Sequence, residues 1–143
     1  MESAIRAFFE RYAAVFNRAL HGEIDMVEAA SLYAPEFIAA SPQGVMAGKN
    51  DDGLKHAMAQ GYARYRAIGT REMRLGTMRL SALDDLHCVA HVGWTAVYAR
   101  EDEPDIAIEF EVHYFMQTLA GDSKVFGWVS GDEEALLREH GIV

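Results

Sequence analysis

Cysteine and proline are both rare in this chain of 143 residues, which has one cysteine, Cys88, and three prolines. A single thiol cannot form an internal disulfide, so the chain is not a disulfide-stapled extracellular scaffold, and we expect a reducing, cytoplasmic environment. No evident cationic neighbour activates Cys88, which we interpret as a buried, unreactive thiol. The prolines, Pro35, Pro42 and Pro104, each fall where a turn or a strand boundary is expected.

Positive charge is also scarce, because 13 lysines and arginines face 22 acidic residues and the formal net charge is -9 at pH 7. Binding to nucleic acid needs a positive surface, so we expect none. No apolar run approaches the roughly 20 residues that span a bilayer. The first residues lack the basic segment, apolar core and cleavage site of a signal peptide. We therefore expect no membrane contact.

What the chain does have is ordinary globular composition, with 50% hydrophobic and 24% charged residues. Its length suits one domain with a substantial core. No internal repeat, low-complexity tract or linker divides it, so we predict a single domain over residues 1–143.

Apolar residues recur at helical spacing in three N-terminal segments. Residues 2–21 predict a long amphipathic helix, and residues 24–33 a short one, with Met26, Val27, Ala30 and Tyr33 facing inward. Asp51 or Asp52 is expected to cap a third helix that continues to Ile68. Gly61 lies within its apolar stripe and predicts close backbone packing, since glycine is otherwise unfavourable inside a helix.

The rest of the chain alternates with the period of strands. We predict short strands at 37–40 and 45–47, and longer ones at 70–83, 87–100, 105–119 and 124–130. Apolar parity switches near Gly76, which predicts a β-bulge there. A final helix is expected at 133–140, capped by Ser130 or Asp132. Helices followed by an antiparallel meander indicate an α+β fold.

The two longest strands can be set in register by keeping apolar and polar residues on separate faces, because a slip of one residue exchanges the faces. The preferred register places Tyr98 opposite Ile106 and His91 opposite His113. A turn at 120–122 then sets the last strand beside this hairpin, with Phe126 next to Met116. The face expected under the helices carries Trp94, Tyr98, Phe110, Tyr114, Met116, Phe126 and Trp128.

Short motifs in this order resemble the nuclear-transport-factor-2-like superfamily, which includes SnoaL-like cyclases and ketosteroid isomerases. They are Arg11-Tyr12, the stretch 32–37 with Ser41-Pro42-Gln43-Gly44 after it, and the closing stretch 128–131. The resemblance implies a cone-shaped, curved antiparallel sheet with three N-terminal helices on its concave face and a short C-terminal helix. It also implies a pocket between the layers and, often, a homodimer through the outer face of the sheet.

The isomerase chemistry of that superfamily uses a tyrosine, a carboxylate base and a second, protonated aspartate. Tyr12 falls at the tyrosine position, Ser41 at the position of the base, and Val112 or His113 near the second aspartate. A serine hydroxyl is too weak a base to replace a carboxylate, so steroid-type isomerisation is not expected. Tyr12, Ser41 and His113 remain as candidate catalytic residues.

Aromatic side chains point to ligand binding, because aromatic walls recur in small-molecule sites. The expected pocket residues are Tyr12, Phe16, Tyr62, Trp94, Phe110, Tyr114 and Trp128. We predict a domain that binds a small apolar or aromatic molecule, without a cofactor. Two alternatives stay open: an isomerase, cyclase or dehydratase using acid–base chemistry on a small hydrophobic substrate, and a structural dimer with a vestigial pocket.

The predicted cross-strand pair of His91 and His113, with Glu111 diagonally near, also offers the ligand types of a zinc site. Metal geometry demands more than adjacency, and we favour a polar outer face that meets solvent or a second subunit over a metal site. If that face forms a dimer, protonation of the pair below a pH of about 6.5 would weaken it.

Overall fold

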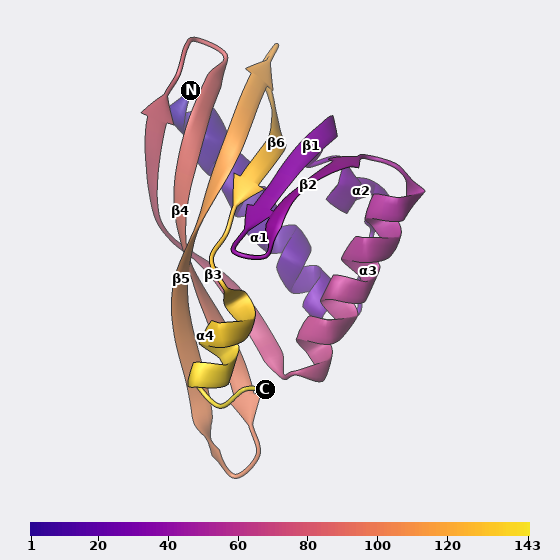
Figure 1. Cartoon of the computed structure of the whole chain (residues 1–143), viewed down its shortest axis with the longest axis vertical. Coiled ribbons are helices and arrows are strands. Elements are labelled where there is room, and N and C mark those ends of the chain that lie inside the picture. The colour runs from indigo at the N-terminus through magenta and orange to yellow at the C-terminus, as the bar shows by residue number, and fades with distance from the viewer.

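The computed structural model describes residues 1–143 as four helices and six strands (Figure 1). The helices are α1 (Glu2–Leu20), α2 (Met26–Ala30), α3 (Asp52–Ala67) and α4 (Glu133–Glu139). The strands are β1 (Tyr33–Ser41), β2 (Gly44–Lys49), β3 (Thr70–Ala82), β4 (His87–Arg100), β5 (Glu103–Leu119) and β6 (Asp122–Val129).

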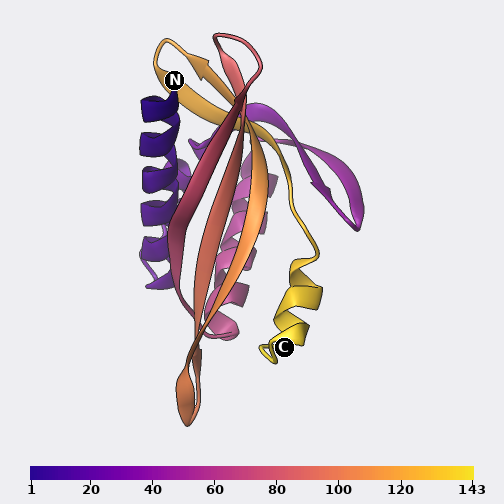
Figure 2. The same ribbon diagram turned by 90° about the vertical axis from the view of Figure 1, so that its left-hand side faces the viewer.

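The strands form one curved, unclosed sheet in the order β2-β1-β6-β5-β4-β3. All neighbouring pairs are antiparallel except β1 and β6, which run parallel. Helices α1 and α3 lie along one side of this sheet, and α4 follows β6 as a separate short helix (Figures 1 and 2). The α+β cone expected from the sequence is therefore confirmed.

Side-chain caps begin the shorter helices, because aspartate oxygens accept hydrogen bonds from otherwise unpaired backbone N–H groups. Asp25 accepts from two amides of α2, Asp51 from Gly53 and Leu54 in α3, and Asp132 from Ala135 in α4. Helix α1 is instead held by its apolar stripe, which buries Ile5, Phe8, Phe9, Val15, Ala19 and Leu20.

The expectation of a helix over residues 24–33 was wrong at its C-terminal end. Helix α2 stops at Ala30, and Tyr33 already belongs to β1, where it pairs with Val125 of β6. The backbone N–H of Val125 also donates to the carbonyl of Leu32, so strand pairing overrides the helical pattern. Val27, expected inside, is 71% exposed. The close backbone packing predicted at Gly61 was also wrong, because no atom beyond the adjoining turns of α3 lies within 4 Å of a Cβ placed there.

The register of the long hairpin is confirmed: Tyr98 lies opposite Ile106 and His91 opposite His113. Strand β5 begins earlier than expected, at Glu103, because a tight turn at Glu101-Asp102 replaces the predicted four-residue loop. Asp102 adopts a φ of 57° there, a conformation that aspartate tolerates better than most residues.

The bulge at Gly76 is also confirmed. Leu75 pairs with Trp94 and Met78 with Val92, so β3 carries one more residue than β4 across this stretch. A Cβ atom at Gly76 would lie 2.9 Å from the carbonyl oxygen of Gly93, which explains why glycine occupies this position. Because of the bulge, the apolar residues of β3 on both sides of Gly76 face the helices.

The predicted position of Phe126 was wrong. Tyr114 pairs with Trp128, but Met116 pairs with Val125 instead of Phe126, because the register of β5 and β6 shifts between Phe115 and Met116. This shift turns Phe126 to the outer face of the sheet, where its ring lies 5.9 Å from that of Phe115.

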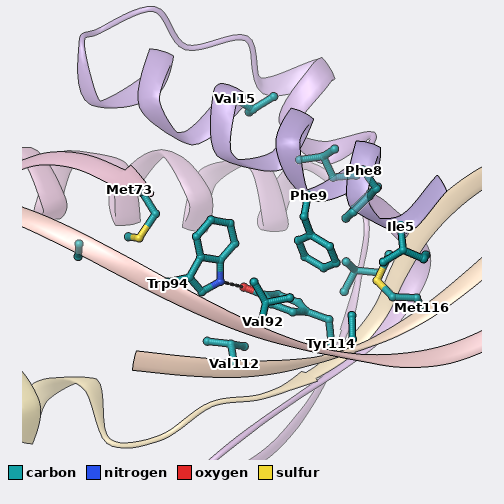
Figure 3. Packing of buried hydrophobic residues seen from close by; sticks show 14 of the residues in the cluster. Ile5, Phe8, Phe9, Val15, Met73, Val92, Trp94, Val112, Tyr114 and Met116 are labelled. Atoms are coloured by element: carbon teal, nitrogen blue, oxygen red, sulfur yellow. Dashed lines mark hydrogen bonds between the residues drawn. The ribbon is translucent and has the colours of Figure 1, made fainter. Parts of the chain in front are cut away.

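The core lies between α1 and the concave face of the sheet (Figure 3). Phe9 points from α1 toward the sheet, and its ring centroid lies 4.8 Å from that of Tyr114. Cys88 is 1% exposed in this core, and burial raises the pKa of its thiol, in keeping with an unreactive side chain. No helix of the protein combines the length and the apolar character needed to cross a membrane.

Candidate functional site

A cavity of about 210 Å³ lies between the helices and the concave face of the sheet. It is lined by 12 residues that come from α1, α3, α4 and all strands except β2, together with the segment that follows β6. Most of the lining is aromatic. The residues are Tyr12, Phe16, Tyr33, Tyr65, Met73, Trp94, Phe110, Val112, Tyr114, Trp128, Ser130 and Glu133.

The lining of this cavity includes a network of hydroxyl groups. The indole N–H of Trp94 donates to the hydroxyl oxygen of Tyr114 at 3.0 Å (Figure 3). The hydroxyls of Tyr12 and Tyr33 share a hydrogen bond of 3.2 Å, and Tyr114 also hydrogen-bonds Tyr12. Three tyrosines from α1, β1 and β5 therefore meet at one point, held in place by Trp94 on β4.

Burial keeps these phenols protonated, because desolvation disfavours the charged form. It raises the pKa of Tyr12, and it raises the pKa values of Tyr33 and Tyr114 well above the usual range. For Tyr12, hydrogen bonds from its tyrosine neighbours partly offset the rise. At neutral pH the network can therefore offer hydroxyl donors to a ligand, but no phenolate.

The one charged residue of the cavity is Glu133, in the first turn of α4. Its Oε1 accepts a hydrogen bond of 2.6 Å from the hydroxyl of Tyr65. No lysine, arginine or histidine lies within salt-bridge distance of Glu133, whereas Arg64 pairs with the adjacent Glu134 at 2.5 Å. Burial raises the pKa of Tyr65, and the charge and hydrogen bond of Glu133 raise it further. This phenol therefore remains a hydrogen-bond donor to the carboxylate.

The structure brings together six of the seven expected pocket residues. Tyr62 is the exception: its ring packs edge-on against Phe16 at 5.4 Å and faces a separate small crevice beside α2. The lining residues that sequence reasoning missed are Tyr33, Tyr65, Met73, Val112, Ser130 and Glu133. Tyr65 could have been found from the sequence, because it lies four residues after Gly61 and therefore on the same apolar stripe of the third helix. Tyr33 was hidden by its assignment to a helix.

Ser41 lies outside the aromatic cavity. It borders a second cavity of about 290 Å³ under the β1–β2 hairpin, which shares Trp128 and Ser130 with the first. Its hydroxyl donates to the Gln43 side chain at 2.8 Å, and no carboxylate or histidine lines this space. No residue lining this space could therefore activate Ser41 as a base or a nucleophile.

His113, the remaining catalytic candidate, lies on the outer face of the sheet, while its neighbour Val112 faces the cavity. The Nδ1 atoms of His113 and His91 are 2.7 Å apart, and Glu111 Oε1 lies 3.4 Å from His113 Nε2. Burial, then the positive charge of Arg79, lowers the pKa of His91. Because ligand atoms of His91, Glu111 and His113 all lie within 4.8 Å of one another, these three side chains could hold a metal ion.

A family model described as NTF2-like protein (DUF6841) matches residues 2–133. This match covers most of the sequence, and the chain therefore belongs to that family. None of the curated proteins matches the sequence.

Solved structures with the same architecture have little sequence in common with this chain. An NTF2-like protein with a cystatin-like fold from Novosphingobium aromaticivorans gives a TM-score of 0.70 at 10% identity, over 99% of this chain and 88% of its own. An NTF-2 like protein of unknown function from Shewanella oneidensis gives 0.65 at 13% identity, over 92% and 98%. A ketosteroid isomerase-like protein from Erwinia carotovora atroseptica gives 0.62 at 13% identity, over 90% and 93%. These likenesses show the fold alone.

Proposed function

We propose that this NTF2-like protein binds a small apolar or aromatic molecule in its aromatic cavity. The observation that carries the proposal is the lining itself, in which ten of 12 residues are hydrophobic and the other two, Ser130 and Glu133, are polar. Binding sites for small molecules have this composition, with apolar walls and a few placed polar groups.

The size of the cavity limits the ligand. A dry cavity of roughly 150 Å³ accommodates one benzene molecule. The space of about 210 Å³ therefore suits one ring with small substituents, or an aliphatic molecule of similar bulk, and it is too small for a fused four-ring steroid. The hydroxyl of Tyr12 and the carboxylate of Glu133, both in the lining, would orient such a molecule through hydrogen bonds.

Intrinsic fluorescence offers a direct test, because the chain has two tryptophans and both line the cavity. Titration with toluene, phenol and indole should change the emission saturably and raise the melting temperature. Trp128→Ala should weaken binding, because it removes one wall.

Phe126→Ala is the matched control for that variant, since it removes an aromatic ring from the outer face instead. Equal binding by both variants, or no saturable response to any of the three compounds in the wild-type protein, would refute the proposal.

A second candidate function, acid–base catalysis on a small substrate, is favoured by one observation: a carboxylate lies in the cavity. Glu133 would act as the general base in place of Ser41 and His113, and Tyr12 would donate a hydrogen bond to developing negative charge. A relative in fold is described as ketosteroid isomerase-like. The test is deuterium exchange at the enolisable carbon of a small aryl ketone, followed by NMR. Catalysis predicts exchange that Glu133→Gln abolishes, and exchange at the buffer rate would remove this candidate.

We also propose that the protein forms a homodimer through the outer face of the sheet. That face carries the adjacent rings of Phe115 and Phe126, the latter 6.1 Å from the His87 ring, beside the polar pair of His91 and His113. An apolar centre with a polar surround is typical of subunit interfaces. Sedimentation velocity measures the mass directly, and Phe126→Asp should yield monomers.

A further inference from the structure

We propose that the ligand of the aromatic cavity is a small organic cation, with an ammonium or quaternary ammonium head. This inference rests on the proposed function and narrows it: the ligand keeps the apolar surface that the cavity walls contact and adds one positive charge. It is carried by the combination of aromatic walls with one carboxylate that has no cationic partner.

The walls are rich in the groups that attract cations. Eight of the 12 lining residues are aromatic, and two of them are tryptophans, the rings with the strongest cation–π attraction. The rings surround the space from different directions: Tyr12 comes from α1, Tyr33 from β1, Trp94 from β4 and Trp128 from β6. An apolar ligand would need only hydrophobic walls, whereas electron-rich rings on several sides of the space favour positive charge.

The carboxylate of Glu133 supplies the complementary charge. Its only side-chain partner is the neutral hydroxyl of Tyr65 at 2.6 Å. The nearby arginines are engaged elsewhere, because Arg64 and Arg138 both pair with Glu134 and Arg66 donates to the carbonyl of Ala19. Glu133 can therefore pair with a cation brought by a ligand, without first breaking a salt bridge of the protein.

No basic side chain of the protein fills this role itself, because none of the 12 lining residues is a lysine, arginine or histidine. The protein as a whole, with a formal net charge of -9, would also attract cations and repel anions. Both the local and the overall charge thus oppose an anionic ligand and favour a cationic one.

The head group is limited by the same volume that limits the ligand. A cavity of about 210 Å³ admits a trimethylammonium group with a short tail. With the head against the rings, the tail would extend past Glu133, whose side chain is exposed at the mouth of the cavity. The volume therefore limits the head group that enters the cavity, and not the tail outside it.

The experiment compares two probes of the same shape and different charge. One is choline, and the other is 3,3-dimethylbutan-1-ol (dimethylbutanol below), in which carbon replaces the quaternary nitrogen. Tryptophan fluorescence and calorimetry measure both affinities on the wild-type protein. We expect choline to bind at least about 10-fold more tightly, because desolvated cation–π contacts and a carboxylate favour the charge. Equal or reversed affinities would overturn the inference. Toluene serves as a third, apolar probe.

Binding of toluene without choline refutes the cationic class and leaves the proposed function standing, whereas no binding of any of the three probes refutes the proposed function as well. Glu133→Gln should lower the choline affinity about 5- to 10-fold and leave that of dimethylbutanol unchanged, because it removes charge while keeping an acceptor for Tyr65. Glu139→Gln makes the same chemical change at the other end of α4 and should alter neither. A choline affinity that falls equally in both variants would also contradict the role of Glu133.

Discussion

Raising the pH should unfold this protein cooperatively, because its tyrosines are held neutral by the fold. Every one of the six tyrosines has a raised pKa: desolvation is the first cause in each case, and for Tyr98 the value reaches about 12. In the unfolded chain a tyrosine has a pKa of about 10. Since the folded-state values are higher, the stabilisation is complete below about pH 10 and is lost as the pH rises toward the folded-state values.

The magnitude follows from proton linkage. Each tyrosine that is ionised in the unfolded chain but protonated in the native protein lowers the free energy of unfolding by about 1.4 kcal/mol per pH unit. Six such residues acting together lower it by about 8 kcal/mol per unit, which is comparable to the roughly 5–15 kcal/mol that stabilises a small domain. We therefore expect the native state to be lost within about one pH unit above pH 10.5.

The assay is a titration that records tyrosinate absorbance and far-ultraviolet circular dichroism on the same samples. We expect the two signals to change together, with almost no tyrosinate before unfolding begins. The chain in strong denaturant is the control and should titrate near the ordinary pKa of tyrosine, about 10. A native circular dichroism spectrum with half of the tyrosines ionised near that pH would show that they are not buried as described.

Two further predictions concern individual contacts. Tyr114→Phe should destabilise the protein by about 1–3 kcal/mol in urea unfolding, because the buried indole N–H of Trp94 loses its acceptor. A double-mutant cycle with Trp94→Phe should recover a coupling of about 1 kcal/mol, and additive losses would contradict the hydrogen bond. Lowering the pH from about 8 to about 5.5 should weaken the proposed dimer, because protonation of His91, whose Nδ1 lies 2.7 Å from that of His113, would add positive charge to the interface on both subunits. Sedimentation that is unchanged between these two conditions, or equally changed in His91→Asn, would refute this explanation.

The register of the long hairpin could be predicted from the sequence because one face is buried and the other is not. In β4 and β5, buried residues alternate with less buried ones over many positions, and the predicted register keeps the histidines and glutamates on the less buried face. The bulge at Gly76 was visible for the same reason, since the parity of β3 changes there. Long strands carry enough alternating residues to determine their own pairing.

Short elements carry too few residues for this, and their contacts with distant segments decide their structure. Tyr33 continues a helical pattern locally, but pairing with Val125 places it in a strand. Phe126 alternates correctly with Trp128, yet the shifted register of β6 turns it outward. Neither outcome is encoded in the neighbouring residues, because each depends on a partner strand whose position is set by the whole sheet.

The same contrast applies within the cavity. Its walls come largely from residues on the concave face of β4 and β5, and from α1, whose periodic patterns predict burial. Its charge comes from Glu133, which looks like an ordinary acidic residue in the first turn of an exposed helix. What makes Glu133 part of the site is the path of the chain after Trp128, which leads α4 back across the cavity mouth to Tyr65. The charge of the site is therefore set by one side chain on a peripheral element, while the aromatic walls belong to the core. If the cavity binds a ligand as proposed, a substitution at Glu133 should change which ligands are accepted at little cost to the fold, whereas a substitution in the walls should alter binding and stability together.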